Sequence, residues 1–205
     1  NDIYRYIWEG YIQLHGFNPY QLAPDAPALA HLIPGDMASI WPHINHRDMS
    51  AVYPPLVLLL FKGLAALSTA PFLFKAAMLA FDLLTLGVLV RLVRWQRLPG
   101  AYLFWYALNP LVLVYVAGEG HLDSVQAAFL MLGLCALCFN KPFMGFLSMG
   151  TAAVSKYFSA VALPFVTQRS NLRAWPAAAA ALLFFLPFAD APDRKSTRLN
   201  SSHYS

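Results

Sequence analysis

The stretch PFLFKAAMLAFDLLTLGVLVRLV, residues 71–93, decides the fold class that this sequence predicts. Its only charged residues are Lys75, Asp82 and Arg91, and most of the others are apolar. A helix needs roughly 20 predominantly apolar residues to cross the hydrocarbon core of a bilayer. Residues 71–93 are therefore predicted to form a transmembrane helix.

Further apolar stretches continue this pattern toward the C-terminus. They cover residues 101–117, 122–139, 142–166 and 173–189. The stretch 142–166 contains Lys156 and Pro164, so it predicts either one kinked span or two half-helices. An earlier stretch, residues 56–67, is too short for a span and is expected to lie on or dip into the outer interface.

The composition of the whole chain agrees with lipid as its surroundings. Of its 205 residues, 59% are hydrophobic and 12% are charged, whereas a soluble domain carries roughly 25% charged residues. The net charge of +4 fits loop lysines and arginines beside membrane spans better than a nucleic-acid surface. We therefore expect an all-α, polytopic transmembrane helix bundle over residues 53–189, in contact with membrane lipid and without a nucleic-acid partner.

The segments that flank this bundle are polar. Residues 1–52 are predicted to form a long external loop, in which residues 3–14 form a short amphipathic helix along the membrane interface. Residues 190–205 include RKSTRLNSSH, which resembles translated sequencing-adapter sequence. We expect this tail to be a sequence artefact and the remainder to be a fragment that is open at both ends.

Basic residues orient the predicted bundle. Those between and after the spans are Arg91, Arg94, Arg97, Lys141, Arg169 and Arg173. The positive-inside rule places them on the cytoplasmic side, which leaves residues 1–52 and the turn at 118–121 together on the outer face. This orientation requires that residues 56–67 do not cross the membrane and that residues 142–166 leave and return.

Neither the cysteines nor the histidines predict a metal or redox site. Cys135 and Cys138 share one face of a predicted apolar helix, where buried structural thiols are expected. The spacing of His43 and His46 can serve a metal on a helix, but the neighbouring Pro42 favours a loop. The chain also shows no Gly-rich phosphate loop, serine nucleophile elbow or zinc helix motif, so a nucleotide-using site is unsupported.

Two short polar segments carry groups that can perform chemistry. The first is DIYRYIWEG, residues 2–10, in which a carboxylate can accept a proton from a sugar hydroxyl and aromatic rings can stack on sugars. An interfacial belt of Tyr and Trp explains the same composition. The second is the turn GEGHLD, residues 118–123, where Glu119, His121 and Asp123 crowd between two spans, although Asp123 can also cap the next helix.

Lys156, Asp82 and Lys75 are charged residues within the predicted spans that lie away from the basic clusters. Lys156 marks a substrate path and can neutralise a lipid phosphate, or it snorkels to the interface. Asp82 lies near the middle of residues 71–93 and is expected to pair with a polar group on another helix rather than to react. Lys75 is expected to snorkel outward.

The segments that carry a family resemblance are DIYRYIWEG (2–10), GFNPY (16–20), YPPL (53–56), FDLL (81–84), NPL (109–111), GHLDS (120–124), and SKY (155–157) ahead of LP (163–164). Taken in order, they resemble the GT-C superfamily of membrane glycosyltransferases. Within it they look most like bacterial polyprenol-phosphate mannosyltransferase-like proteins and the catalytic subunit of GPI mannosyltransferase I. The resemblance covers nearly all of the chain before residue 190, and each motif is short, so their order and spacing carry it.

The resemblance implies transfer of a sugar, mannose in the most similar proteins, from a polyprenyl-phosphate carrier to a hydroxyl of a glycan or lipid acceptor, with inversion. It implies a site on the outer face of a bacterial plasma membrane, with Asp2 as the catalytic base and with Glu119 or Asp123 orienting sugar hydroxyls. No cofactor is required, and a divalent metal at the carboxylates is compatible with the chemistry without being needed. The residues expected to hold the lipid phosphate are Arg5, His121 and Lys156.

The sequence also departs from the family pattern. Such proteins have a span before the acidic motif and often a second carboxylate beside it, whereas Asn1 precedes Asp2 here. We therefore expect the fragment alone to be inactive. The alternatives from other classes are a multi-pass transporter or lipid flippase and a non-catalytic membrane subunit. The long aromatic outer loop and the lack of a visible inverted repeat favour the enzyme.

Overall fold

The structure, a computed structural model, describes residues 2–167 and 175–189, and these residues form helices and connecting turns without any strand. The predicted all-α class is therefore confirmed for the described part of the chain. The α-helices are α1 (Ile3–Leu14), α2 (Pro55–Leu67), α3 (Pro71–Trp95), α4 (Tyr102–Ala107), α5 (Asp123–Cys138), α6 (Pro142–Ala153), α7 (Ala162–Thr167) and α8 (Trp175–Phe185). Shorter turns are η1 (Pro27–Leu32), η2 (Trp41–His43), the π-helical η3 (Val112–Gly118), η4 (Tyr157–Val161) and η5 (Leu186–Phe188).

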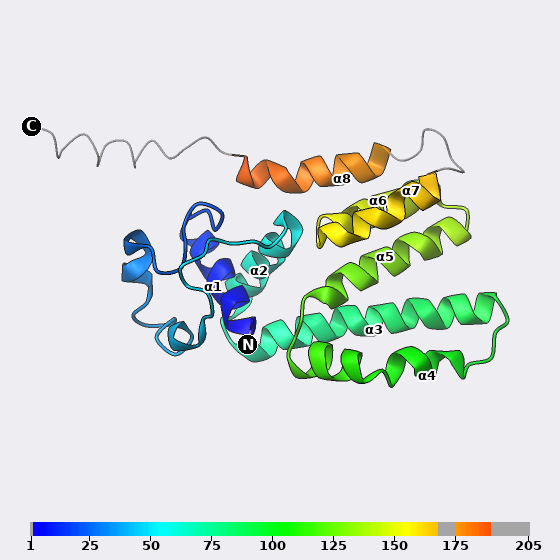
Figure 1. Cartoon of the computed structure of the whole chain (residues 1–205), viewed down its shortest axis with the longest axis horizontal. Helices are drawn as coiled ribbons and strands as arrows, with labels where there is room; N and C mark the ends of the chain where they lie inside the picture. The colour runs from blue at the N-terminus through cyan, green and yellow to red at the C-terminus, as the bar shows by residue number, and fades with distance from the viewer. Residues whose placement is uncertain (1, 168–174, 190–205) are drawn as a thin grey trace, which may run out of the picture.

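The longer helices lie side by side, and the polar N-terminal segment gathers at one end of them (Figure 1). α3 and α5 run in the same direction, because Ser124 contacts Met78 near their starts and Phe139 contacts Trp95 near their ends. α6 returns antiparallel to α5. We call the end where α3 and α5 begin the α1 end, and the opposite end, where α3 finishes, the arginine end.

α3 is the described helix that is clearly long and apolar enough to cross a membrane. It has 25 residues, a mean hydropathy of 2.0 over its most apolar window, and only 17% of that window buried within the chain. η3 and α5 reach the length and hydropathy of a membrane span only when they are taken together across a bend of 113°. The predicted span at 71–93 thus has its helix, whereas the multi-pass arrangement as a whole stays a prediction.

Two of the predicted apolar stretches are interrupted. The stretch 101–117 breaks between α4 and η3, where Pro110 has no backbone N–H to continue the helix and the side chain of Asn109 accepts a hydrogen bond from Leu111 N at 2.9 Å. The stretch 142–166 divides into α6 and the returning η4–α7 pair, with Lys156 in extended conformation at the bend. Of the two forms predicted for 142–166, the structure shows two half-helices.

The N-terminal segment forms its own small core. α1 has the bounds predicted for the helix at 3–14, but it is buried on most sides by α2 and the 15–54 loop instead of exposing a polar face. Tyr6 stacks on Phe61 of α2, with ring centroids 4.5 Å apart. Gly10 allows this approach, because a Cβ atom there would collide with the backbone of Phe61.

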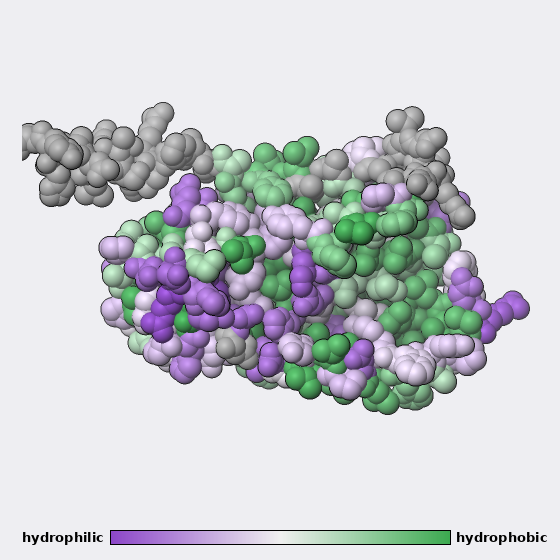
Figure 2. Space-filling view, in the orientation of Figure 1, coloured by the Kyte–Doolittle hydropathy of each residue, from purple (hydrophilic) through white to green (hydrophobic). Residues whose placement is uncertain are grey.

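The surface divides in the same way as the fold. Hydrophilic side chains gather over the N-terminal segment, and hydrophobic ones cover much of the helices (Figure 2). Large apolar side chains such as Phe72, Trp105 and Phe165 are about four-fifths exposed, which in a soluble monomer would be unusual. Arg169, Arg173 and the tail at 190–205, on which earlier predictions depend, lie outside the described residues.

Candidate active site at the α1 end

Three of the predicted site residues meet where α1 begins. Asp2 immediately precedes the first turn of α1, and His121 follows η3 in the turn that leads into α5. The His121 Nε2 atom lies 4.0 Å from Asp2 Oδ2 and 3.7 Å from Glu119 Oε2. One imidazole therefore faces two carboxylates, all of them between a quarter and a half exposed.

Gly120 and Lys75 shape the turn that carries His121. Gly120 has a φ of +74°, in the left-handed region, and a Cβ atom there would lie 3.0 Å from Lys75 Cγ and 3.1 Å from Ile3 Cδ1. The Lys75 ammonium donates a hydrogen bond to Gly118 O at 2.8 Å, a favourable position for a cation at the end of a helical turn. Lys75 thus lies beside the site, whereas the sequence predicted only that it snorkels outward.

Asp123 and Lys156 form a second charged pair at the same end. Asp123 is the first residue of α5, and Lys156 sits at the bend between α6 and η4. The Lys156 ammonium donates to Asp123 Oδ1, and both side chains are about half exposed. The bend in the 142–166 stretch is therefore what brings this lysine to the α1 end.

Tyr6 lies near both the Asp2–Glu119–His121 cluster and the Asp123–Lys156 pair. Its hydroxyl is buried near the backbone of Leu122, within electrostatic range of both Asp2 and Asp123, and it makes no hydrogen bond of ordinary geometry with the described residues. Burial raises the pKa of Tyr6 far above its usual value, and Tyr53 and Asp2 add to the effect. Tyr6 is therefore a neutral phenol buried within electrostatic range of the carboxylates. Nothing in the sequence alone distinguished Tyr6 from the neighbouring aromatic residues.

Arg5 lies apart from this cluster. Its buried guanidinium donates from Nε to Glu9 Oε1 at 2.5 Å. The other two nitrogens donate to the loop carbonyls of His46 at 2.6 Å and Met49 at 2.5 Å, with a longer contact to Asn45 O at 3.3 Å. These contacts occupy the guanidinium and favour a structural role over the predicted contact with a lipid phosphate.

Glu9 is buried with Arg5 inside the N-terminal segment. Burial raises the pKa of Glu9 to about 7, and the nearby Arg5 charge only partly opposes this. Its second oxygen, Oε2, has no hydrogen-bond partner among the described residues. The Arg5–Glu9 pair therefore has a structural role inside the N-terminal segment and lies apart from Asp2, Glu119 and His121.

No group of three metal-ligating side chains occurs in the described ranges. His43 stacks on Tyr4, with centroids 4.8 Å apart, and its Nδ1 faces Ser39 O at 3.1 Å. His46 lies in a turn with a φ of +46°. These positions agree with the loop interpretation of the two histidines.

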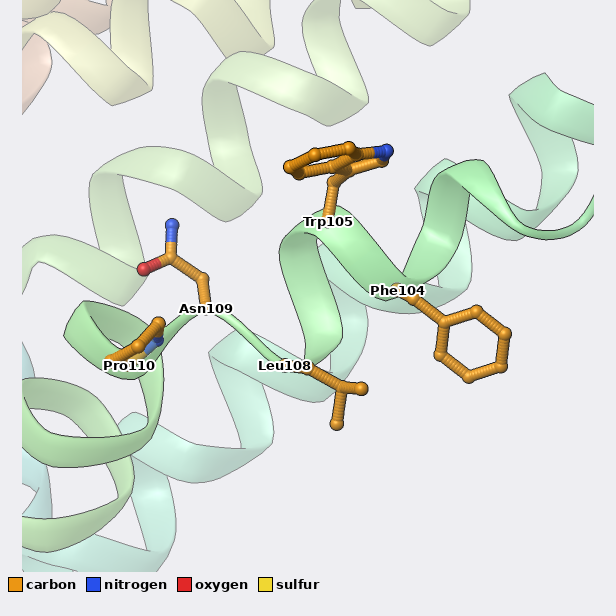
Figure 3. Close-up of a pocket in the computed structure, with 5 residues that line it drawn as sticks. All are labelled: Phe104, Trp105, Leu108, Asn109 and Pro110. Carbon is orange, nitrogen blue, oxygen red and sulfur yellow. The ribbon is translucent and has the colours of Figure 1, made fainter.

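An apolar hollow of about 510 Å³ opens where α4 breaks before η3. Figure 3 shows Trp105 and Asn109 facing one side of the chain, with Phe104 and Leu108 pointing away from them. Its lining is mostly apolar and contains none of the predicted site residues. The hollow therefore lies outside the candidate active site.

Comparisons with known proteins show which family the chain resembles. The model of a family described as alpha-(1->6)-mannopyranosyltransferase, N-terminal domain, matches residues 1–170. Alpha-(1->6)-mannopyranosyltransferase A of Mycobacterium tuberculosis is 25% identical over 171 residues, which cover 80% of this chain and 32% of that protein. The chain thus spans about a third of the length of this relative, and no solved structure matches it.

Proposed function

Since the chain belongs to the alpha-(1->6)-mannopyranosyltransferase family through its N-terminal domain, we propose that it carries the acidic centre of a mannosyltransferase that uses a polyprenyl-phosphate donor. The observation that supports this most directly is the meeting of Asp2, Glu119 and His121 at the α1 end. Carboxylates beside an imidazole bind hydroxyl groups and can accept their protons. The transporter or flippase alternative has no comparable support.

In the proposed reaction, Asp2 takes the proton of the acceptor hydroxyl. The acceptor oxygen then forms a bond to C1 of mannose, and the bond between C1 and the carrier phosphate oxygen breaks. The polyprenyl phosphate leaves with the electron pair, so the configuration at C1 inverts. A phosphate leaving group needs no acid, only positive charge to stabilise it.

We propose Lys156 and His121 for that electrostatic role. In the structure Lys156 faces Asp123 and His121 faces Glu119. When the donor binds, its phosphate would replace these carboxylates as the partner of Lys156 and His121. Asp123 and Glu119 would then be free to orient sugar hydroxyls. Arg5 is not part of this proposal, because its donors are occupied within the fold. No metal is required by this scheme.

We further propose that the helices lie in a membrane, with the α1 end at the outer face. α3 has the required length and exposure. The end of α3, with Arg91 and Arg94, lies at the arginine end and would face the cytoplasm under the positive-inside rule. A lipid-linked donor would then present its phosphate at the level of Asp2 and Lys156.

Mannose transfer from labelled polyprenyl-phosphate-mannose, in membranes that carry the full-length protein, tests this function. We expect Asp2→Asn to lower transfer by at least about a hundredfold, because the base is lost, without changing the amount of inserted protein. Asp36→Asn replaces an exposed acid in the 15–54 loop and should leave transfer unchanged. Full activity in Asp2→Asn would move the base to Glu119 or Asp123, and no transfer by the wild type would overturn the donor class.

A further inference from the structure

Asn45 lies against the proposed base although 43 residues separate them in the chain. It belongs to the loop between η2 and α2, and its side-chain amide donates to Asp2 Oδ1 at 2.7 Å. The other oxygen of Asp2 faces His121 at 4.0 Å. The two oxygens of the Asp2 carboxylate therefore face two different parts of the chain.

The loop that carries Asn45 is held on both sides. On one side, Ile44 is buried in the core. On the other, His46 has a φ of +46°, and the buried Arg5 guanidinium donates to its carbonyl and to that of Met49. A non-glycine residue in the left-handed region persists where surrounding contacts hold it. The amide of Asn45 is thus held in place at Asp2.

A general base needs a fixed direction as well as a suitable proton affinity. Asp2 is about a third exposed at the start of a helix, where an unrestrained carboxylate would rotate among several rotamers. The hydrogen bond from Asn45 restrains Oδ1 and leaves Oδ2 on the side of His121.

We propose that Asn45 is a positioning residue for Asp2, which it orients so that Oδ2 receives the proton of the acceptor hydroxyl. The Arg5–Glu9 pair acts one step further back, by holding the turn that carries Asn45. This inference rests on the proposed function, in which Asp2 is the base.

Kinetics of the full-length protein test the proposal. We expect Asn45→Ala to lower kcat about tenfold while the KM for the lipid-linked donor changes less than about twofold. Asn18→Ala is the matched control, since Asn18 also lies in the 15–54 segment, between α1 and η1, and its side chain accepts a hydrogen bond from Tyr20 N at 3.0 Å. This control should keep the wild-type kcat.

A second variant separates positioning from a structural role. Asn45→Asp places a carboxylate beside Asp2, which is already near Glu119, His121 and Tyr6. Like charge disfavours ionisation of a base, so the acid limb of the kcat profile should move to higher pH. A purely structural change would reduce the amount of folded enzyme and leave the limb in place.

The outcomes distinguish this inference from the function on which it rests. Full activity in Asp2→Asn would remove the premise itself. A large loss in Asp2→Asn together with wild-type kinetics in Asn45→Ala would overturn the role of Asn45 alone. If both single changes lower kcat, the double variant should be no slower than Asp2→Asn, because Asn45 acts only through Asp2; a further loss would contradict the proposal.

Discussion

Arg5 is the buried charge that joins α1 to the loop at 45–49. Removing one partner of a buried ion pair leaves the other uncompensated, which typically costs 3–5 kcal/mol. We expect Arg5→Met to lower the free energy of unfolding by about 3 kcal/mol at pH 8, the lower end of that range, because the stranded Glu9 can take up a proton. Denaturant unfolding of purified protein, followed by tryptophan fluorescence, measures this change.

Arg47→Met provides the comparison for Arg5. Arg47 also donates to loop carbonyls, those of Ile44 at 3.1 Å and Pro42 at 2.8 Å, but its side chain is only partly buried and makes no ion pair among the described residues. Its replacement should cost only about 1 kcal/mol. Equal losses in the free energy of unfolding for the two substitutions would show that burial of the Arg5–Glu9 pair does not increase its contribution to stability.

Glu9 should make stability depend on pH. Its pKa in the folded protein is raised to about 7, above the ordinary 4.5, chiefly by burial. Between these values the folded state keeps a proton that the unfolded state releases, so stability falls as the pH rises from about 4.5 to 7. The contribution of Glu9 to this fall is at most about 3 kcal/mol.

Melting temperatures from pH 5 to pH 8 check this prediction. Glu9→Gln removes the titrating group, so the decline attributed to it should disappear and the curve should become flatter. Glu119→Gln, which replaces a half-exposed acid, should retain the wild-type slope. A Glu9→Gln variant with the wild-type pH dependence would assign the decline to other groups.

At the scale of elements, α1 and α2 approach closely only because residue 10 is glycine. A Cβ atom at this position would meet the carbonyl of Phe61 and lie 2.9 Å from Ala65 Cβ. We expect Gly10→Ala to destabilise the fold by about 1–3 kcal/mol, because a backbone cannot yield as a flexible side chain does. Thermal unfolding of the purified protein measures the loss.

Gly63→Ala tests the same helix pair without the collision. A Cβ atom at Gly63 has open space around it, so the higher helix propensity of alanine should keep or slightly raise stability. If both substitutions had the same effect, the close approach of α1 to α2 would not depend on Gly10.

α3 and α4 are joined by a polar contact between apolar surfaces. The Tyr106 hydroxyl donates to Asp82 Oδ1 at 2.6 Å, which confirms the prediction that Asp82 pairs with another helix. A double-mutant cycle with Asp82→Asn and Tyr106→Phe should give a coupling energy of about 1 kcal/mol, the usual size of a net hydrogen-bond contribution. Tyr102→Phe, on the same helix but exposed, should show no coupling to Asp82.

Hydrophobic patterning predicted the elements better than their contacts. The bounds of α1 and the helix at 71–93 follow from periodicity and length, and Lys156 signalled the bend in 142–166. The sequence did not predict the break at Pro110, because the apolar composition of 101–117 is that of a single span. Asn45, which lies remote in sequence from Asp2, could not be connected to it before the path of the loop was known.

At the scale of the whole molecule, charge and apolar surface are separated along one axis. The acidic cluster (Asp2, Glu119 and His121) and the polar N-terminal segment occupy the α1 end. α3 finishes at the arginine end, where the Arg91 guanidinium lies over the ring of Phe139, 4.6 Å from its centroid. Exposed apolar side chains cover the helices between them. This separation is what a membrane-embedded bundle requires, since charged groups belong outside the hydrocarbon core.

The two ends should therefore be accessible from opposite sides of a membrane. Ser39 lies exposed in the loop of the N-terminal segment, and Gln96 lies exposed just after α3. After Cys135 and Cys138 are replaced by serine, we expect an impermeant maleimide to label Ser39→Cys in intact cells. Gln96→Cys should react only after the membrane is permeabilised, because the arginine end faces the cytoplasm in the proposed orientation.

A reversed pattern, with Gln96→Cys labelled first, would invert the orientation and place the acidic cluster on the cytoplasmic side, away from an outer-face donor. Labelling of both positions in intact cells would show that α3 does not separate the two ends across a bilayer. Either result would leave the Asp2–His121–Glu119 geometry intact. The labelling thus tests the membrane placement independently of the chemistry, which mannose transfer by the Asp2→Asn variant tests.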